Sequence, residues 1–121
     1  METAEHITTR TFNFAVRVVE LATFLDSKPG VSGTLAKQLL RAGTSIGANV
    51  EEAQGSQSRA DFLSKMSIAL KEARETLYWL RLLQAAHLCS EKQLAEMTAE
   101  ANEIVSILVA IVINTRKNNS A

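Results

Sequence analysis

Residues 104–113 read IVSILVAIVI, and nine of these ten residues are apolar. A helix that packs against one side of a small core needs only one apolar stripe. A helix that is apolar almost all round must be covered on more than one side. Ten residues are too few to cross a bilayer, which takes roughly 20. We therefore expect other copies of the same chain to cover the flank of this helix.

The preceding residues carry three further apolar series, so the chain has four in all. In each series the apolar positions recur every three or four residues, which is the spacing of an amphipathic helix. The series are Ile7, Thr11, Phe14, Val18, Leu21 and Leu25; Leu35, Leu39, Ala42, Ile46, Val50 and Ala53; Phe62, Met66, Ala69, Ala73, Thr76, Leu80, Leu83 and His87; and Leu94, Met97, Ala101, Ile104, Leu108 and Ile111. No stretch of useful length alternates polar and apolar residues as a strand does.

Short connections join these segments and set their directions. Pro29-Gly30 ends the first helix, and Gly55 lies in the link between the second and third. Short links force neighbouring helices to run antiparallel. The side chains expected to cap the later helices are Ser32 or Thr34, Ser58 with Asp61, and Ser90 with Gln93. We predict an all-α fold, an antiparallel up-down-up-down four-helix bundle that forms one domain over residues 1–121, with a frayed polar tail after residue 113.

Two glycines, Gly43 and Gly47, fall inside the second helix. Each costs about 1 kcal/mol relative to alanine in a helix interior. Their spacing of four residues places both on one face, where a neighbouring backbone can approach closely. We favour close helix packing there over a loose helix.

Composition restricts the function. The 13 basic residues equal the 13 acidic residues, and this balance is evidence against a dedicated nucleic-acid binder. Cys89 is the only cysteine, so no internal disulfide forms. The polar start METAEHITTR lacks the apolar core of a signal peptide. We expect a soluble cytoplasmic protein that does not bind membranes.

Residues suited to catalysis or metal binding are sparse. Di-iron bundles use Glu-x-x-His pairs, whereas this chain has Glu72-x-x-Glu75 and Glu100-x-x-Glu103 without a histidine. Cys89 and His87 lie at a helix junction, but one thiol beside one imidazole is a weak signal of a nucleophile. We expect no catalytic residues, no metal and no other cofactor.

A polar face on the second and third helices has two interpretations. It bonds the two helices together and fixes their register, or it forms a pocket for a small ligand. We favour the first, because serine and asparagine in mid-helix need partners. The residues of this polar face are Arg41, Ser45, Asn49, Glu52, Glu72 and Glu75.

A basic stripe and an apolar interface are the other candidate surfaces. Basic residues with an aromatic can contact phosphates and stack a base, although a solvated face with local ion pairs is the commoner arrangement. The candidate nucleic-acid stripe is Arg10, Arg17, Lys71, Arg74, Tyr78 and Arg81. The candidate interface between subunits is Trp79, Ile107, Val109, Val112 and Ile113. On the first helix, Phe12, Val16, Val19 and Phe24 also lie off the apolar stripe.

Three stretches carry a family resemblance: RAGTSIGANVEEA at 41–53, SRADF at 58–62 and IALKEARET at 68–76. Over residues 7–114 the chain resembles the small bacterial four helix bundle proteins, which are related to proteins encoded in intervening sequences of large-subunit ribosomal RNA genes. Ser45, Asn49 and Glu52 match the polar positions of that family. Where many members have Ala-Glu-Gly, this chain has Glu51-Glu52-Ala53, which puts in doubt any role that needs a tight backbone there.

The resemblance implies a ring-shaped homopentamer and no enzymatic activity. Family members resemble accessory proteins of diversity-generating retroelements, which bind nucleic acid and a reverse transcriptase. Those relatives are markedly basic, whereas this chain is neutral. We therefore expect a non-enzymatic, homo-oligomeric scaffold that binds itself. The alternatives are a nucleic-acid-binding accessory protein, with weak binding to RNA or DNA, and a small-ligand binder at the polar face.

Overall fold

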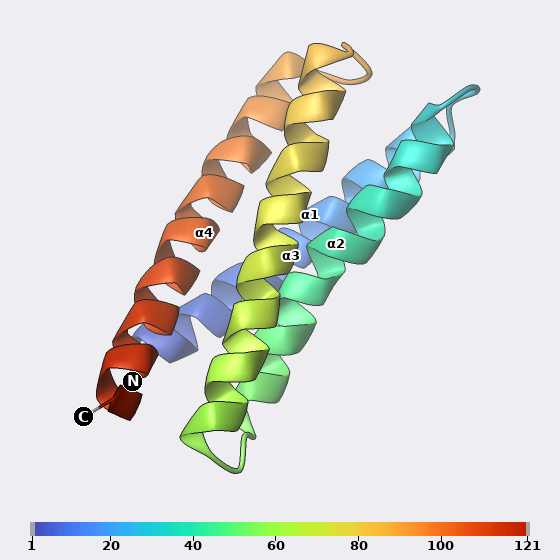
Figure 1. Cartoon of the computed structure of the whole chain (residues 1–121). Helices are drawn as coiled ribbons and strands as arrows, with labels where there is room; N and C mark the ends of the chain where they lie inside the picture. Colours follow the sequence, from blue (N-terminus) through green and yellow to red (C-terminus); the bar gives the residue numbers. More distant parts are fainter. Residues whose placement is uncertain (1, 121) are drawn as a thin grey trace.

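The computed structural model describes the backbone of residues 2–120 and the side chains of residues 6–118. Four helices make up the fold: α1 (Glu2–Asp26), α2 (Ser32–Gln54), α3 (Arg59–Ala85) and α4 (Glu91–Ser120). Consecutive helices run in opposite directions and are joined by short links (Figure 1). The predicted all-α four-helix bundle is confirmed.

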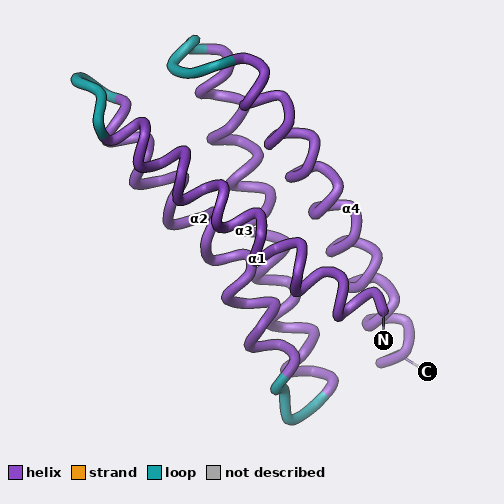
Figure 2. Tube along the Cα trace, turned by 180° about the vertical axis from the view of Figure 1, so that it is seen from behind, coloured by secondary structure: helices purple, strands orange, loops and turns teal. Residues whose placement is uncertain are grey.

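The helices do not pack equally tightly around the bundle. α1 packs closely on α2, α2 on α3 and α3 on α4, whereas α1 and α4 approach each other closely at far fewer positions. The two chain ends lie side by side at one end of the bundle, as both views show (Figures 1 and 2). The seam between the first and last helices is therefore the loosest of the four.

The interior is built from the predicted apolar stripes. Every member of the first series, from Ile7 to Leu25, is buried. The other three series are buried along most of their length, and burial of one large aliphatic side chain contributes about 1.5–3 kcal/mol. The exceptions are three half-buried residues and one exposed residue, respectively Leu35, Phe62 and Ile111, and His87. The polar members Thr11 and Thr76 donate hydrogen bonds to carbonyls of their own helices.

The two glycines of α2 lie where α1 comes closest. A Cβ atom added at Gly47 would lie 3.3 Å from the backbone oxygen of Thr11. A Cβ added at Gly43 would lie 2.7 Å from a methyl carbon of Val18. The predicted close packing is confirmed, because a Cβ atom at either position would lie closer to α1 than ordinary van der Waals contact.

The helix ends agree only in part with the sequence-based expectations. The Ser58 hydroxyl accepts a hydrogen bond from the amide of Asp61 at 3.0 Å, and the Ser90 hydroxyl accepts one from Gln93 at 3.4 Å, as predicted. The expected cap on α2 is wrong: this helix starts at Ser32, follows Val31, and has no side-chain cap. The expectation of a frayed tail after residue 113 is also wrong, since α4 continues to Ser120. Within the described residues, no helix is long and apolar enough to span a membrane.

Candidate functional site

The outer side of α1 carries an uncovered apolar row. Phe12 is 63% exposed, Val16 44% and Val19 45%. These side chains follow one another at helical spacing on the side of α1 that faces away from the core. A single exposed apolar residue is ordinary, but a continuous row of them is a candidate contact surface.

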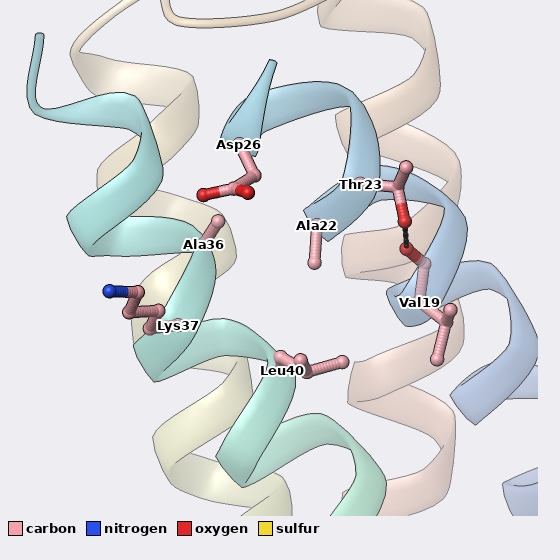
Figure 3. A pocket seen from close by; sticks show the side chains of 7 residues that line it. All are labelled: Val19, Ala22, Thr23, Asp26, Ala36, Lys37 and Leu40. Atoms are coloured by element: carbon pink, nitrogen blue, oxygen red, sulfur yellow. Dashed lines mark hydrogen bonds between the residues drawn. The ribbon is translucent and has the colours of Figure 1, made fainter. Parts of the chain in front are cut away.

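A shallow notch continues this row onto α2. Its volume is about 280 Å³, and its lining is mostly apolar, with Asp26 and Lys37 as its charged members. Figure 3 shows Leu40 extending from α2 toward α1, while the small side chains of Ala22 and Ala36 leave the space between the helices open. We call Phe12, Val16, Val19 and Leu40 the α1 face.

The predicted α4 interface needs correction. Val112 is only 3% exposed and belongs to the core of the bundle, so its side chain is not available for contact with another chain. Ile107 and Val109 are half-buried, whereas Ile113 is 45% exposed. The reason is that 104, 108 and 112 continue the core stripe of α4, while the flanking residues pack beside α1 and α3. Most of the apolar segment is thus covered within the subunit, and the larger uncovered surface lies on α1.

Trp79 is held within the subunit as well. It is half-buried against the core, and its indole nitrogen donates a hydrogen bond to Glu75 at 3.1 Å. Its ring meets the Tyr78 ring edge to face, with 5.2 Å between the centroids. This arrangement leaves Trp79 as a support for Tyr78 rather than as a projecting anchor.

Arg10 and Arg17 lie in the seam between α1 and α4. Arg10 makes a two-pronged contact with Glu100, at 2.6 and 3.0 Å, and reaches Glu103 at 3.3 Å. Arg17 lies 3.5 Å from Glu96. Hydrogen bonding to Glu100 raises the pKa of the Arg10 guanidinium. Ion pairs therefore bridge the seam where apolar packing is sparse.

The structure consequently divides the predicted nucleic-acid stripe. α1 and α3 are diagonal in the bundle and do not pack on each other, so Arg10 and Arg17 do not join the basic residues of α3. The α3 members share one exposed side of that helix: Lys71, Arg74, Tyr78 and Arg81. Beside them is an open notch of about 440 Å³, which is lined by Lys71, Arg74 and, from α4, Arg116. The sequence analysis missed Arg116. It could have been found as a basic residue near the end of the fourth helix, which runs antiparallel to α3.

The charged members of the polar face form ion pairs between α2 and α3. Arg41 pairs with Glu72 at 3.5 Å and closely with Glu75. Glu52 accepts a hydrogen bond from Lys65 at 3.0 Å, and this bond raises the pKa of Lys65. The sequence analysis also missed Lys65, the seventh residue of α3, although its closeness to the link from α2 was a usable signal.

Ser45 and Asn49 behave differently from the charged members of the polar face. The Ser45 hydroxyl donates to the carbonyl of Arg41 at 2.6 Å, and the Asn49 amide donates to the carbonyl of Ser45 at 2.8 Å. Both bonds remain inside α2. The expectation of interhelical bonding thus applies to the charged residues and not to these two.

The remaining reactive groups lie near the link between α3 and α4. Burial raises the pKa of the Cys89 thiol, and the positive charge of Lys28 opposes this shift only in part. A thiol with a raised pKa is a poor nucleophile at neutral pH. Across the described residues, no group of three or more His, Cys, Asp or Glu side chains is placed to hold a metal ion.

The fold and these surfaces define a small all-α protein with a closed helical core and several exposed contact faces. The sequence profile of the 23S rRNA-intervening sequence proteins matches residues 5–110, and the chain belongs to this family. The resemblance drawn from residues 41–76 is thereby confirmed.

A solved structure supports the same assignment. It is a protein of unknown function from the S23 ribosomal protein family of Bacteroides thetaiotaomicron VPI-5482, determined at 1.70 Å resolution. The chain is similar to it with 44% sequence identity and a TM-score of 0.81, over 88% of this chain and 97% of that one. No curated protein is significantly similar to the chain.

Proposed function

We propose that the protein is a non-enzymatic cytoplasmic scaffold whose subunits associate through the α1 face. The observation that carries the proposal is the exposed row Phe12, Val16 and Val19 on a bundle whose core is otherwise complete. The protein has no need of this row for its own interior, because Ile7, Phe14 and the rest of the first series already fill it.

Covering the row would contribute favourably to association. A phenylalanine side chain buries about 150–250 Å², and apolar area contributes about 25 cal/mol per Å². Covering the exposed 63% of Phe12 therefore contributes on the order of 3 kcal/mol. Val16, Val19 and Leu40 add smaller amounts, and the notch between α1 and α2 offers space for a side chain of the neighbour.

The family resemblance suggests five subunits in a ring. A closed ring of five needs two different surfaces on each subunit, because each contact joins the front of one copy to the back of the next. We assign the α1 face to one of these surfaces. On α4, Ile113 is the exposed apolar residue that a neighbour could cover.

A pair of charge insertions on the same helix tests this proposal. Val16→Glu places a carboxylate in the α1 face, whereas Asn13→Glu places the same charge at an exposed polar position nearby. A carboxylate buried without a partner is costly. Analytical ultracentrifugation should find smaller particles for Val16→Glu and unchanged assemblies for Asn13→Glu, with circular dichroism confirming that both remain helical. Equal assembly of the two variants would refute the role of the α1 face.

We do not extend the proposal to small-ligand binding at the polar face. Ser45 and Asn49 use their donors on their own helix, and the charges of Arg41, Glu72 and Glu75 are directed at one another. A ligand there would have to displace these bonds.

A further inference from the structure

The zero net charge of the chain conceals an uneven distribution of charge. In the α1–α4 seam, Arg10 and Arg17 pair with Glu96, Glu100 and Glu103. In the α2–α3 seam, Arg41 pairs with Glu72 and Glu75, and Lys65 pairs with Glu52. Six carboxylates are thus paired with four bases in two of the four seams, so these seams hold more acidic than basic groups.

The outer side of the α3–α4 seam has the opposite character. Lys71, Arg74 and Arg81 project from α3, and Arg116 lines the adjoining notch from α4. The sequence contains no Asp or Glu from residue 76 to 90 or after residue 103, and Glu72 and Glu75 point to α2. We call Lys71, Arg74, Tyr78, Arg81 and Arg116 the α3–α4 face.

The cations of α3 are spaced for a linear polyanion. Among the described hydrogen bonds and ion pairs, none involves Lys71, Arg74 or Arg81, so these groups keep their full charge for a ligand. At about 1.5 Å per residue, the rise from residue 71 to residue 81 is roughly 15 Å. A row of positive charges of that length contacts several consecutive phosphates rather than one isolated anion.

An aromatic side chain lies in the middle of this row. Tyr78 is half-exposed, and its ring is supported from one side by Trp79, which Glu75 holds by a hydrogen bond. A base stacks on such a ring only when it has left its own helix, as bases do in single strands. An aromatic between cations is therefore better suited to a single strand than to a duplex.

We propose that the α3–α4 face binds a single-stranded nucleic acid. Lys71, Arg74, Arg81 and Arg116 contact the phosphates, and Tyr78 stacks on one base. This inference goes beyond self-association and does not depend on it, since every residue of the face belongs to one subunit. Assembly into a ring would repeat the face and increase the avidity.

The test is a titration of a fluorescent oligothymidylate of about 20 nucleotides, a length that exceeds the footprint of one face, followed by anisotropy at several salt concentrations. The wild-type affinity should fall steeply with salt. The double variant Lys71→Gln, Arg74→Gln should bind at least about tenfold more weakly, and its log–log salt slope should be shallower by about 1.4, at about 0.7 per lost phosphate contact.

A matched control removes one lysine and one arginine from elsewhere. Arg59→Gln, Lys92→Gln changes the net charge equally at two exposed positions outside the face, and its affinity should stay within about twofold of wild type because counterion release depends on contacted phosphates. Equal losses in both double variants, or no binding by wild type, would overturn the proposal.

The aromatic contact and the class of ligand have separate readouts. Tyr78→Ala should lose about fivefold or more in affinity, while Tyr78→Phe should retain it, since stacking needs the ring and not the hydroxyl.

A duplex of equal length should bind more weakly. Equal binding of the duplex, or preferential binding of phosphatidylserine vesicles, contradicts the single-strand assignment. Because Val16→Glu leaves the α3–α4 face intact, that variant should still bind the oligothymidylate more weakly after Lys71→Gln, Arg74→Gln, whether or not it assembles.

Discussion

Replacing Gly43 by alanine tests the close approach of α1 and α2. The new Cβ would lie 2.7 and 2.8 Å from the two methyl carbons of Val18 and 3.2 Å from its Cβ. Val18 is fully buried and β-branched, so its side chain has little freedom to turn away. Overpacking of this kind costs typically 1–3 kcal/mol, and the gain in helix propensity is about 1 kcal/mol. The difference between the two leads us to expect that Gly43→Ala lowers the free energy of unfolding by up to about 2 kcal/mol.

The effect of Gly43→Ala on the free energy of unfolding should change sign when the Val18 side chain is shortened. In a Val18→Ala background the methyl groups are gone, so Gly43→Ala should keep only its gain in helix propensity and stabilise by up to about 1 kcal/mol. The coupling between the two positions then equals the overpacking cost of roughly 1–3 kcal/mol, within the range for residues in contact. Urea unfolding followed by circular dichroism measures this double-mutant cycle. The wild type, the two single variants and the double variant are compared at one protein concentration. If Gly43→Ala stabilised the protein equally in both backgrounds, the tight contact would be absent and the packing argument would fail.

Two further predictions concern the link between α3 and α4. His87 has a φ of 56°, in the left-handed region that favours glycine, so His87→Gly should stabilise by about 0.5–1 kcal/mol and raise the melting temperature by roughly 2–5 °C; a lower melting temperature would speak against strain at this residue. Because burial raises the pKa of Cys89, less thiolate exists at pH 8 than in a free cysteine, and iodoacetamide should alkylate the folded protein more slowly than it alkylates glutathione. Faster alkylation would mean that Lys28 outweighs burial.

The helices and their core stripes could be predicted because they depend on local spacing. Ile7, Phe14 and Leu21 recur at intervals that admit only one buried side for a helix, and the structure buries all three. The close packing at Gly47 could also be predicted from the sequence. A glycine inside a helix destabilises it, and close packing against a neighbouring helix can compensate for this cost. Ser58 and Ser90 were recognisable as caps from the residues that follow them.

The sides of the helices that remain exposed could not be predicted as well. Val112 and Phe12 are both apolar residues in apolar surroundings, yet one is buried and the other is the most exposed aromatic of its helix. The difference depends on how each helix is rotated about its axis and on how closely its neighbours approach. α4 lies against α3 along its length and is thereby covered, whereas the outer side of α1 has no neighbour within the subunit.

Pairing across the bundle was equally hidden from the sequence. Arg10 and Glu100 are 90 positions apart, and only the register of α1 against α4 brings them together. The diagonal placement of α1 and α3 separates Arg10 from Lys71, although the two were predicted to share a stripe. Local spacing also suggested partners across helices for Ser45 and Asn49, but a carbonyl four residues earlier was a nearer acceptor.

The mass of the wild-type protein in solution tests the central claim most directly, namely that the α1 face is covered by another subunit. Light scattering coupled to size-exclusion chromatography, repeated over a wide range of dilutions, would give this mass without any substitution. We predict a mass near five times that of the 13.2 kDa chain, unchanged on dilution. A particle with the mass of one chain at every concentration would contradict the account, because Phe12, Val16 and Val19 would then lie permanently in water.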